Sequence, residues 1–334
     1  MKRITFNCLI PIFFIAACSG GSGGISGNGN NNNPPPAGLT IDSANGLEVS
    51  QVAYQSVVSS GDMAGLAGSG VTADSGGGLA KPTMPSQPGG LLAGILQKVP
   101  VGPTEIDCAA GGKVTVTMEI VDILTFAQGV LSAGDTILNE YAMCDEGFGE
   151  VIDGDIDSEV DAFAGNILAN VYDLTMTLTL IDFQVAAGGD VVTANGDGTA
   201  VLNTLNAPYV EASVSGNLMT TDTNNSSETL SNYSSAQTLD AGVIPSPYTM
   251  VASGTLDSSQ LAGAITYSTP VMFEGFDAGY PNAGELLIVG DGSSARIIAE
   301  SNGVDVTIEL YSNTTGSGTP DDTIMTTWAE LAAF

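Results

Sequence analysis

The chain has 334 residues, with 37 acidic residues against six lysines and arginines, a formal net charge of −31 and no histidine. Without histidine, neither a Ser-His-Asp or Cys-His catalytic arrangement nor an imidazole ligand for zinc can form. The strong acidity also argues against nucleic acid as a partner, because phosphate binding requires a basic surface.

The first eighteen residues have the organisation of a secretory signal. Lys2 and Arg3 precede an apolar run from Leu9 to Ala17, which stops at Cys18. The run is too short to cross a bilayer as a helix, since about 20 apolar residues are needed. Small residues before the cysteine resemble the bacterial lipobox. That resemblance implies cleavage before Cys18 and attachment of acyl chains such as palmitate, whereas an ordinary signal with an incidental cysteine is the alternative.

The residue after the cysteine gives a sorting prediction. It is Ser19 rather than aspartate. By the sorting of Gram-negative lipoproteins, the resemblance then implies anchoring in the cell outer membrane, on its periplasmic or its external face. The membrane is therefore the expected partner, reached through the lipid on Cys18.

The four cysteines divide simply under this interpretation. Cys8 leaves with the signal peptide and Cys18 carries lipid, so Cys108 and Cys144 remain. In an oxidising compartment two remaining cysteines favour a disulfide, with two buried free thiols as the alternative.

Composition divides the chain into four parts. The predicted parts are a signal peptide (1–17), a lipid anchor with a long disordered linker rich in Gly, Ser, Asn and Pro (18–40), a helical and Gly-rich connecting segment (41–100) and a β-rich domain (101–334). Asn45 followed by Glu48 resembles a capping box, and apolar spacing predicts a short helix to about Val58. A further apolar stretch covers 91–99.

From about Cys108 the apolar residues alternate with polar ones. The alternation predicts half-buried antiparallel strands at Lys113–Ile120, Asp173–Leu180 and Val304–Leu310, the last with Val304 facing inward. Hairpin turns are predicted at 195–198 and at Asn302-Gly303. With about ten such strands and no long amphipathic helix, the expected fold is mainly β, with antiparallel strands in a sandwich or partly closed barrel.

Four short motifs resemble those of a loosely defined group of uncharacterised Gram-negative outer-membrane lipoproteins. They are Cys108-Ala109-Ala110-Gly111-Gly112, Gly134-Asp135-Thr136 leading to Cys144, Pro281-Asn282-Ala283-Gly284-Glu285 and Thr327-Trp328-Ala329-Glu330-Leu331. The resemblance covers most of 108–334. It implies a β domain with one cysteine pair and brings no known activity.

Residues 151–162 form an acidic, alternating run. Carboxylates occupy its odd positions, at Asp153, Asp155, Asp157, Glu159 and Asp161. On a strand all five lie on one face. Asp153, Asp155 and Asp157 match the start of an EF-hand calcium loop, but Ser158 replaces the glycine and Ala164 the bidentate glutamate. The run is interpreted as a solvated acidic face, with a weak Ca²⁺ site as the alternative.

Two classes of function remain open from the sequence. The first is a non-enzymatic structural or binding module, lipid-anchored outside the cytoplasm, with no cofactor beyond the weak Ca²⁺ and with a protein or glycan ligand that no motif identifies. The second is a carboxylate-based hydrolase such as a glycosidase, which needs no histidine. No nucleophile–base motif supports catalysis, so the non-enzymatic class is preferred. Two facing carboxyl groups in a deep pocket would reverse this order.

Overall fold

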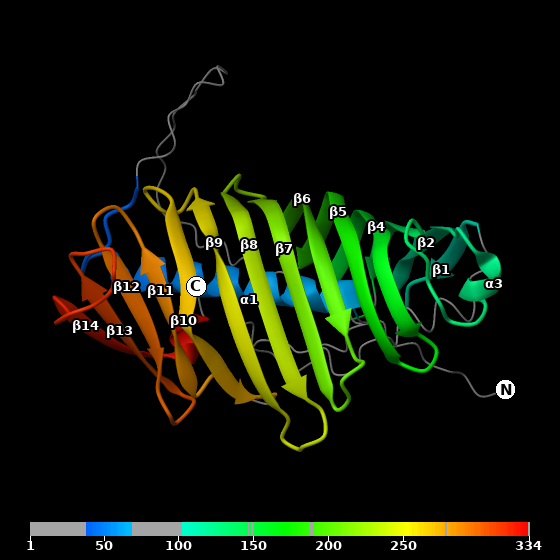
Figure 1. Ribbon diagram of the computed structural model, residues 1–334. Helices are drawn as coiled ribbons and strands as arrows, with labels where there is room; N and C mark the ends of the chain where they lie inside the picture. The colour runs from blue at the N-terminus through cyan, green and yellow to red at the C-terminus, as the bar shows by residue number, and fades with distance from the viewer. Residues whose placement is uncertain are drawn as a thin grey trace.

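The computed structural model describes residues 38–68, 102–145, 147, 150–187, 190–277 and 279–332. The signal peptide, Cys18, most of the predicted linker and the apolar stretch 91–99 lie outside the described residues. In the described part, one antiparallel sheet of 14 strands makes up most of the protein (Figure 1).

The strands lie in the sheet in chain order, so each pairs with its neighbours in sequence. The strands are β1 (Thr104–Asp107), β2 (Gly111–Glu119), β3 (Thr136–Asp145), β4 (Glu150–Asn166), β5 (Val171–Ala187), β6 (Asp190–Asn203), β7 (Tyr209–Asp222), β8 (Ser227–Asp240), β9 (Pro247–Ser258), β10 (Ile265–Phe276), β11 (Ala283–Val289), β12 (Ser294–Ala299), β13 (Asp305–Tyr311) and β14 (Asp322–Thr327). The helices are α1 (Gly46–Gly68), α3 (Ile123–Phe126) and α4 (Trp328–Leu331).

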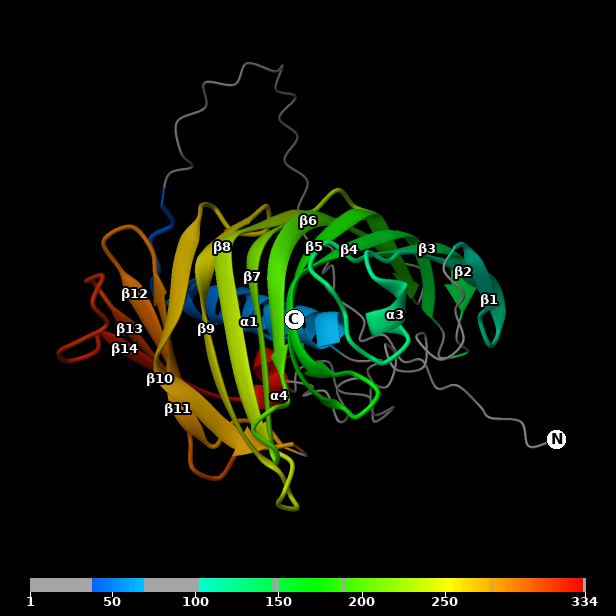
Figure 2. The ribbon, with the colours of Figure 1, turned by 45° about the vertical axis from the view of Figure 1, so that its right-hand side comes forward.

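The mainly β, antiparallel prediction is confirmed. The sheet is single and curved, and it wraps around α1 rather than dividing into two packed layers (Figure 2). β1 and β14 form its two edges, so the sheet does not close. It has more strands than the ten or so predicted, because several of them alternate too weakly to be recognised in the sequence.

Helix α1 lies inside the curved sheet and fills much of its interior. The predicted helix is confirmed, and it extends beyond Val58 to Gly68. Its start differs from a capping box, since the Asn45 side chain bonds back to Thr40 O and Asp42 N. The buried side chains of its first half cover most of its circumference: Val49, Ser50, Val52, Ala53, Tyr54, Ser56, Val57 and Val58. The remaining side carries the exposed Glu48 together with Gln51 and Gln55, whose side-chain amides donate to the backbone oxygens of Glu330 and Ala332 at α4.

The inner face of the sheet carries the apolar half of each alternating strand. In β5 the side chains of Leu174, Met176, Leu178 and Leu180 are buried as predicted. In β13 Val306, Ile308 and Leu310 are buried, but Val304 is 56% exposed. The inward prediction for Val304 is wrong because the strand begins only at Asp305, one residue after it.

The hairpin turn predicted at 195–198 is also wrong, because these residues lie in the middle of β6. Gly198 pairs with Gly216 of β7, and the Tyr233 hydroxyl lies 3.4 Å from the position that a Gly198 Cβ would occupy. A Cβ at Gly216 would lie 2.1 Å from Asp197 O. The glycines therefore allow close approach inside the sheet rather than a reversal of the chain. The second predicted turn, at Asn302-Gly303, is confirmed between β12 and β13.

The C-terminal helix α4 closes one end of the interior. Thr327 and Glu330 form a reciprocal capping box at its start. Trp328 is fully buried, with its ring centroid 4.7 Å from that of Tyr54 in α1, and its Nε1 donates to Pro281 O at 2.9 Å. Two of the four sequence motifs, 281–285 and 327–331, thus meet and hold the interior together.

Among the helices of the described residues, none combines the length and the apolar character that crossing a membrane requires.

Candidate functional site

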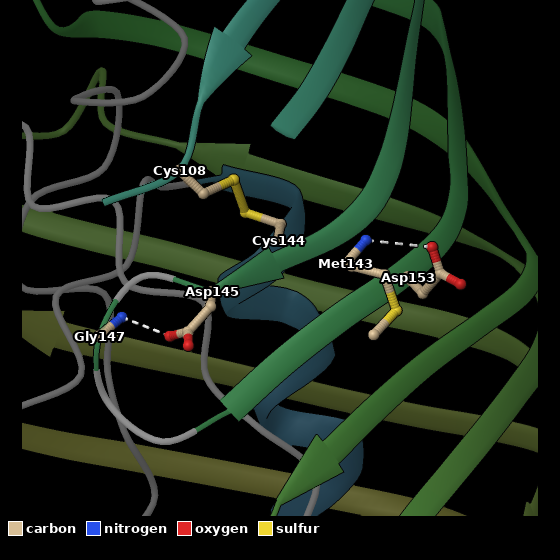
Figure 3. The surroundings of a disulfide bond; sticks show 6 residues. All are labelled: Cys108, Met143, Cys144, Asp145, Gly147 and Asp153. Carbon is tan, nitrogen blue, oxygen red and sulfur yellow. Dashed lines mark hydrogen bonds between the residues drawn. A yellow bond between two sulfur atoms is a disulfide. The ribbon is translucent and has the colours of Figure 1, made fainter. Parts of the chain in front are cut away.

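The predicted disulfide between Cys108 and Cys144 is present (Figure 3). It joins the turn before β2 to the end of β3, with the two Cα atoms 5.5 Å apart. Gly112 has a φ of 71°, and a Cβ there would lie 1.9 Å from Met143 O. The Cys108–Gly112 motif is therefore explained by the tight packing of β2 against β3, which is a structural role.

The acidic run forms the outer face of β4, as predicted. Ile152, Ser158 and Val160 are buried on the inner face, and the intervening carboxylates occupy the other one. Asp153 Oδ1 accepts a long hydrogen bond from Met143 N at 3.3 Å (Figure 3). Asp155 stands directly opposite Glu140 of β3, a like-charge pair that is unfavourable unless water or ions screen it.

These carboxylates do not form a recognisable metal cluster. Within the described ranges, no three His, Cys, Asp or Glu side chains are grouped so that they could hold a metal ion. Asp153, Asp155 and Asp157 follow one another at every second residue of an extended strand, so successive members are about 7 Å apart and the outer two about 13 Å. Such spacing suits a solvated face better than the convergent ligands that Ca²⁺ needs.

A second group of carboxyls, not expected from the sequence, lies between β7 and β8. Asp222 is only 8% exposed, and its Oδ1 accepts hydrogen bonds from Asn224 N at 2.8 Å and Ser226 N at 2.7 Å. Its Oδ2 is buried and has no hydrogen-bond partner among the residues that the structure describes. Glu228 Oε1 accepts from the Ser258 hydroxyl at 3.3 Å.

The two acids differ in their environment. Burial raises the pKa of Glu228 to about 7, the Ser258 hydrogen bond opposes the rise, and the Asp222 charge adds to it. Near neutral pH, Glu228 is therefore partly protonated. Two neighbouring carboxyls in different environments serve as acid and base in hydrolases. Here the same burial that raises the pKa also restricts access of a substrate to the pair.

The connections between strands form two opposite rims of the sheet. Connections after even-numbered strands lie on one side, at 120–135, 167–170, 204–208, 241–246, 277–282 and 300–304. We call this side the apolar rim, because it exposes Val121 (67%), Ile123 (56%), Leu124 (74%), Leu168 (44%), Leu205 (44%), Val243 (50%), Ile244 (93%) and Val304 (56%). No large apolar side chain is comparably exposed in the described connections of the opposite rim.

Hydrogen bonds tie the loops of the apolar rim to one another. The links, in order along the rim, are Ile167 N to Gly129 O (2.9 Å), Thr204 Oγ1 to Asn170 O (3.2 Å), Ala241 N to Pro208 O (3.1 Å) and Asp277 N to Ser246 O (2.9 Å). The first loop is closed internally by Asp135, whose carboxylate accepts from Val121 N and Ser132 N at 2.8 Å each. The apolar side chains are thus held on a preorganised platform.

A groove opens on the outer face where β7 to β10 reach the apolar rim. It has a volume of about 490 Å³ and is lined in part by Tyr209, Asp240, Glu274, Phe276 and Asn282. Tyr209 and Phe276 are 47% and 44% exposed. We call it the rim groove. It combines two accessible aromatic rings with two carboxylates.

A second depression of about 540 Å³ lies on the outer face over β5 to β8. Asp197, Asn217 and Asn232 line it together with serine and threonine side chains. This lining offers hydrogen-bond donors and acceptors to a polar ligand.

Comparison of the chain with protein families finds no matching family, and comparison with curated proteins finds no similar sequence.

Sequence reasoning located the disulfide and the acidic face but missed the buried carboxyl pair and the apolar rim. Asp222 and Glu228 flank a Thr-Asn-Asn-Ser turn that looks like any polar hairpin loop. The apolar rim becomes visible only when strand ends are known. Its signal is an apolar residue inside otherwise turn-like segments such as Leu205-Asn206-Ala207-Pro208 and Gly242-Val243-Ile244-Pro245.

Proposed function

We propose that this protein is a lipid-anchored module of the outer membrane, held outside the cytoplasm, that binds a partner and has no catalytic activity. The lipobox-like sequence ending at Cys18 supports the anchor. The observation that carries the binding role is the position of the apolar rim, which lies opposite the point where the chain enters the sheet.

The entry point is defined by contacts of Gly38 and Leu39. Gly38 bridges to Ala264 in the β9–β10 connection, and Leu39 O accepts from Asp291 N in the β11–β12 connection at 2.8 Å. Both connections belong to the rim opposite the apolar one, as Figure 1 shows for the blue segment. Within the described residues, α1 packs inside the sheet against β6–β9 and β11–β13, and α4 packs against α1 and β14, whereas the apolar side chains of the rim are left exposed.

The anchor is tested by membrane fractionation. In a Gram-negative host we expect the full chain in the outer-membrane fraction, with an acylated N-terminal peptide that begins at Cys18 in the mass spectrum. A Cys18→Ser variant is expected in the soluble extracytoplasmic fraction. An unmodified Cys18, or membrane retention of the variant equal to the wild type, would contradict the lipid anchor.

A carboxylate-based hydrolase is the second candidate, favoured by the separated environments of Asp222 and Glu228. It predicts hydrolysis of chromogenic glycosides by the full chain and loss of that activity in Glu228→Gln. Absence of turnover over a panel of such substrates removes this candidate.

A further inference from the structure

We propose that the apolar rim and the adjoining rim groove dock a protein partner whose contact surface combines apolar side chains with lysine or arginine. The proposal names the partner of the binding module and rests on the proposed function for the orientation of the sheet. Three properties of the rim select this occupant: its rigidity, its position relative to the anchor, and its charge.

The rim is rigid and continuous. Neighbouring loops on one rim of an antiparallel sheet are separated by two strand spacings, or about 10 Å. The hydrogen bonds given above join four such pairs of neighbouring loops on the apolar rim. The loops that carry Leu124 and Ile244 are therefore tied to neighbouring loops before any partner arrives. Ordered loops lower the entropic cost of association, which favours specific binding at this surface.

The position of the rim argues against the anchoring bilayer as occupant. The linker enters at the opposite rim, and β8, with 14 residues, spans about 46 Å between the rims. A module held by that linker presents the apolar rim away from the membrane that anchors it.

The charge of the rim argues against a lipid surface and a second copy. Its described loops contain no lysine or arginine, so nothing attracts anionic headgroups. Two copies, each with a formal charge of −31, would bring Asp240 and Glu274 of both rim grooves together, and these like charges would repel one another.

The rim groove selects a cationic partner instead. Asp240 and Glu274 supply carboxylates, and Tyr209 and Phe276 supply accessible rings beside them. A guanidinium or ammonium group pairs with carboxylates and lies over aromatic faces. Neighbouring apolar tips, with Ile244 the most exposed, receive the apolar part of the same surface.

The test uses the full chain with Cys18→Ser and a synthetic amphipathic helix of leucine and lysine, followed by fluorescence anisotropy. We expect binding that falls at least tenfold in the double variant Leu124→Ser/Ile244→Ser, whose side chains are too exposed to affect folding. Glu274→Gln is expected to weaken binding severalfold. A leucine and glutamate helix is the charge control and is not expected to bind.

Met143→Ser and Met219→Ser are the matched controls, because both side chains are exposed near the ends of β3 and β7 that reach the opposite rim. If the controls lose as much peptide binding as the rim variant, or if the rim variant loses none, the lysine peptide is attracted by the overall acidity of the protein and not by the rim. Either result would overturn the proposal. Rim-dependent flotation with phosphatidylethanolamine and phosphatidylglycerol vesicles would identify a bilayer instead, and a rim-dependent dimer in sedimentation a second copy. Both outcomes refute the proposal of a protein partner. The lipid anchor is tested separately, by the membrane fractionation of the wild type and the Cys18→Ser variant.

Discussion

Replacing Glu228 by glutamine is expected to stabilise the protein at alkaline pH and to leave it nearly unchanged at acidic pH. Burial raises the pKa of the Glu228 carboxyl from 4.5 to about 7. The folded state therefore holds this proton more tightly than the unfolded chain. Stability falls as pH rises from about 4.5 to about 7, and the loss is complete above the folded pKa.

The size of the effect follows from this shift. One pKa unit corresponds to about 1.4 kcal/mol, so a fully ionised Glu228 lowers the free energy of unfolding by about 3.5 kcal/mol. Between pH 5 and pH 8 the linkage relation gives a loss of about 2.5 kcal/mol from this group. Glutamine keeps the shape of the side chain and avoids the buried charge. The free energy of unfolding of Glu228→Gln is therefore expected to rise, relative to that of the wild type, by about 2.5 kcal/mol between pH 5 and pH 8.

Urea unfolding at pH 5 and pH 8, followed by circular dichroism, measures the gap. Glu211→Gln, on the exposed face of the neighbouring strand β7, controls for the loss of one negative charge from a very acidic chain. A gap that does not change with pH, or that changes equally in the Glu211 variant, would show that Glu228 is not held in a desolvated site.

Three further outcomes are expected. Replacing Cys108 and Cys144 together by alanine should lower the free energy of unfolding by about 3 to 4 kcal/mol, because the disulfide closes a loop with a sequence separation of 36; unchanged urea midpoints would contradict this. Trp328→Ala should cost about 3 to 5 kcal/mol in the same assay, since the ring is fully buried against α1, and a cost below 1 kcal/mol would show that α4 does not close the core. The solvated-face interpretation of β4 predicts equal melting temperatures in millimolar calcium and magnesium at fixed ionic strength; a rise specific to calcium that Asp155→Asn removes would establish the weak site instead.

The parts of the fold that could be predicted share a local cause. In β5 and β13 one face is buried and the other solvated, so apolar and polar residues alternate and the period of two is readable. The turn predicted at 195–198 is wrong because a glycine indicates only that many backbone conformations are possible, and not which of them is adopted. Whether it serves a turn or a close approach depends on Tyr233, which is 35 residues further along the chain.

The candidate sites divide in the same way. The alternation at Asp153, Asp155 and Asp157 fixes their common face once a strand is assumed, and the structure places them there. Asp222 and Glu228 acquire their properties from burial, which no local pattern encodes. The rim groove is still less local, since Tyr209, Asp240 and Phe276 belong to three different strands.

The sequence by itself determined the acidity, the absence of imidazole chemistry, the lipobox-like start, the cysteine pair and the alternating strands, because each of these depends on residue identity or on short spacing. Only the tertiary structure decided that 14 strands form one curved sheet around α1, that the chain enters at one rim, and that apolar loop tips gather on the other. These features depend on which strands pair and on the order of the connections, and pairing is set by contacts distant in the chain.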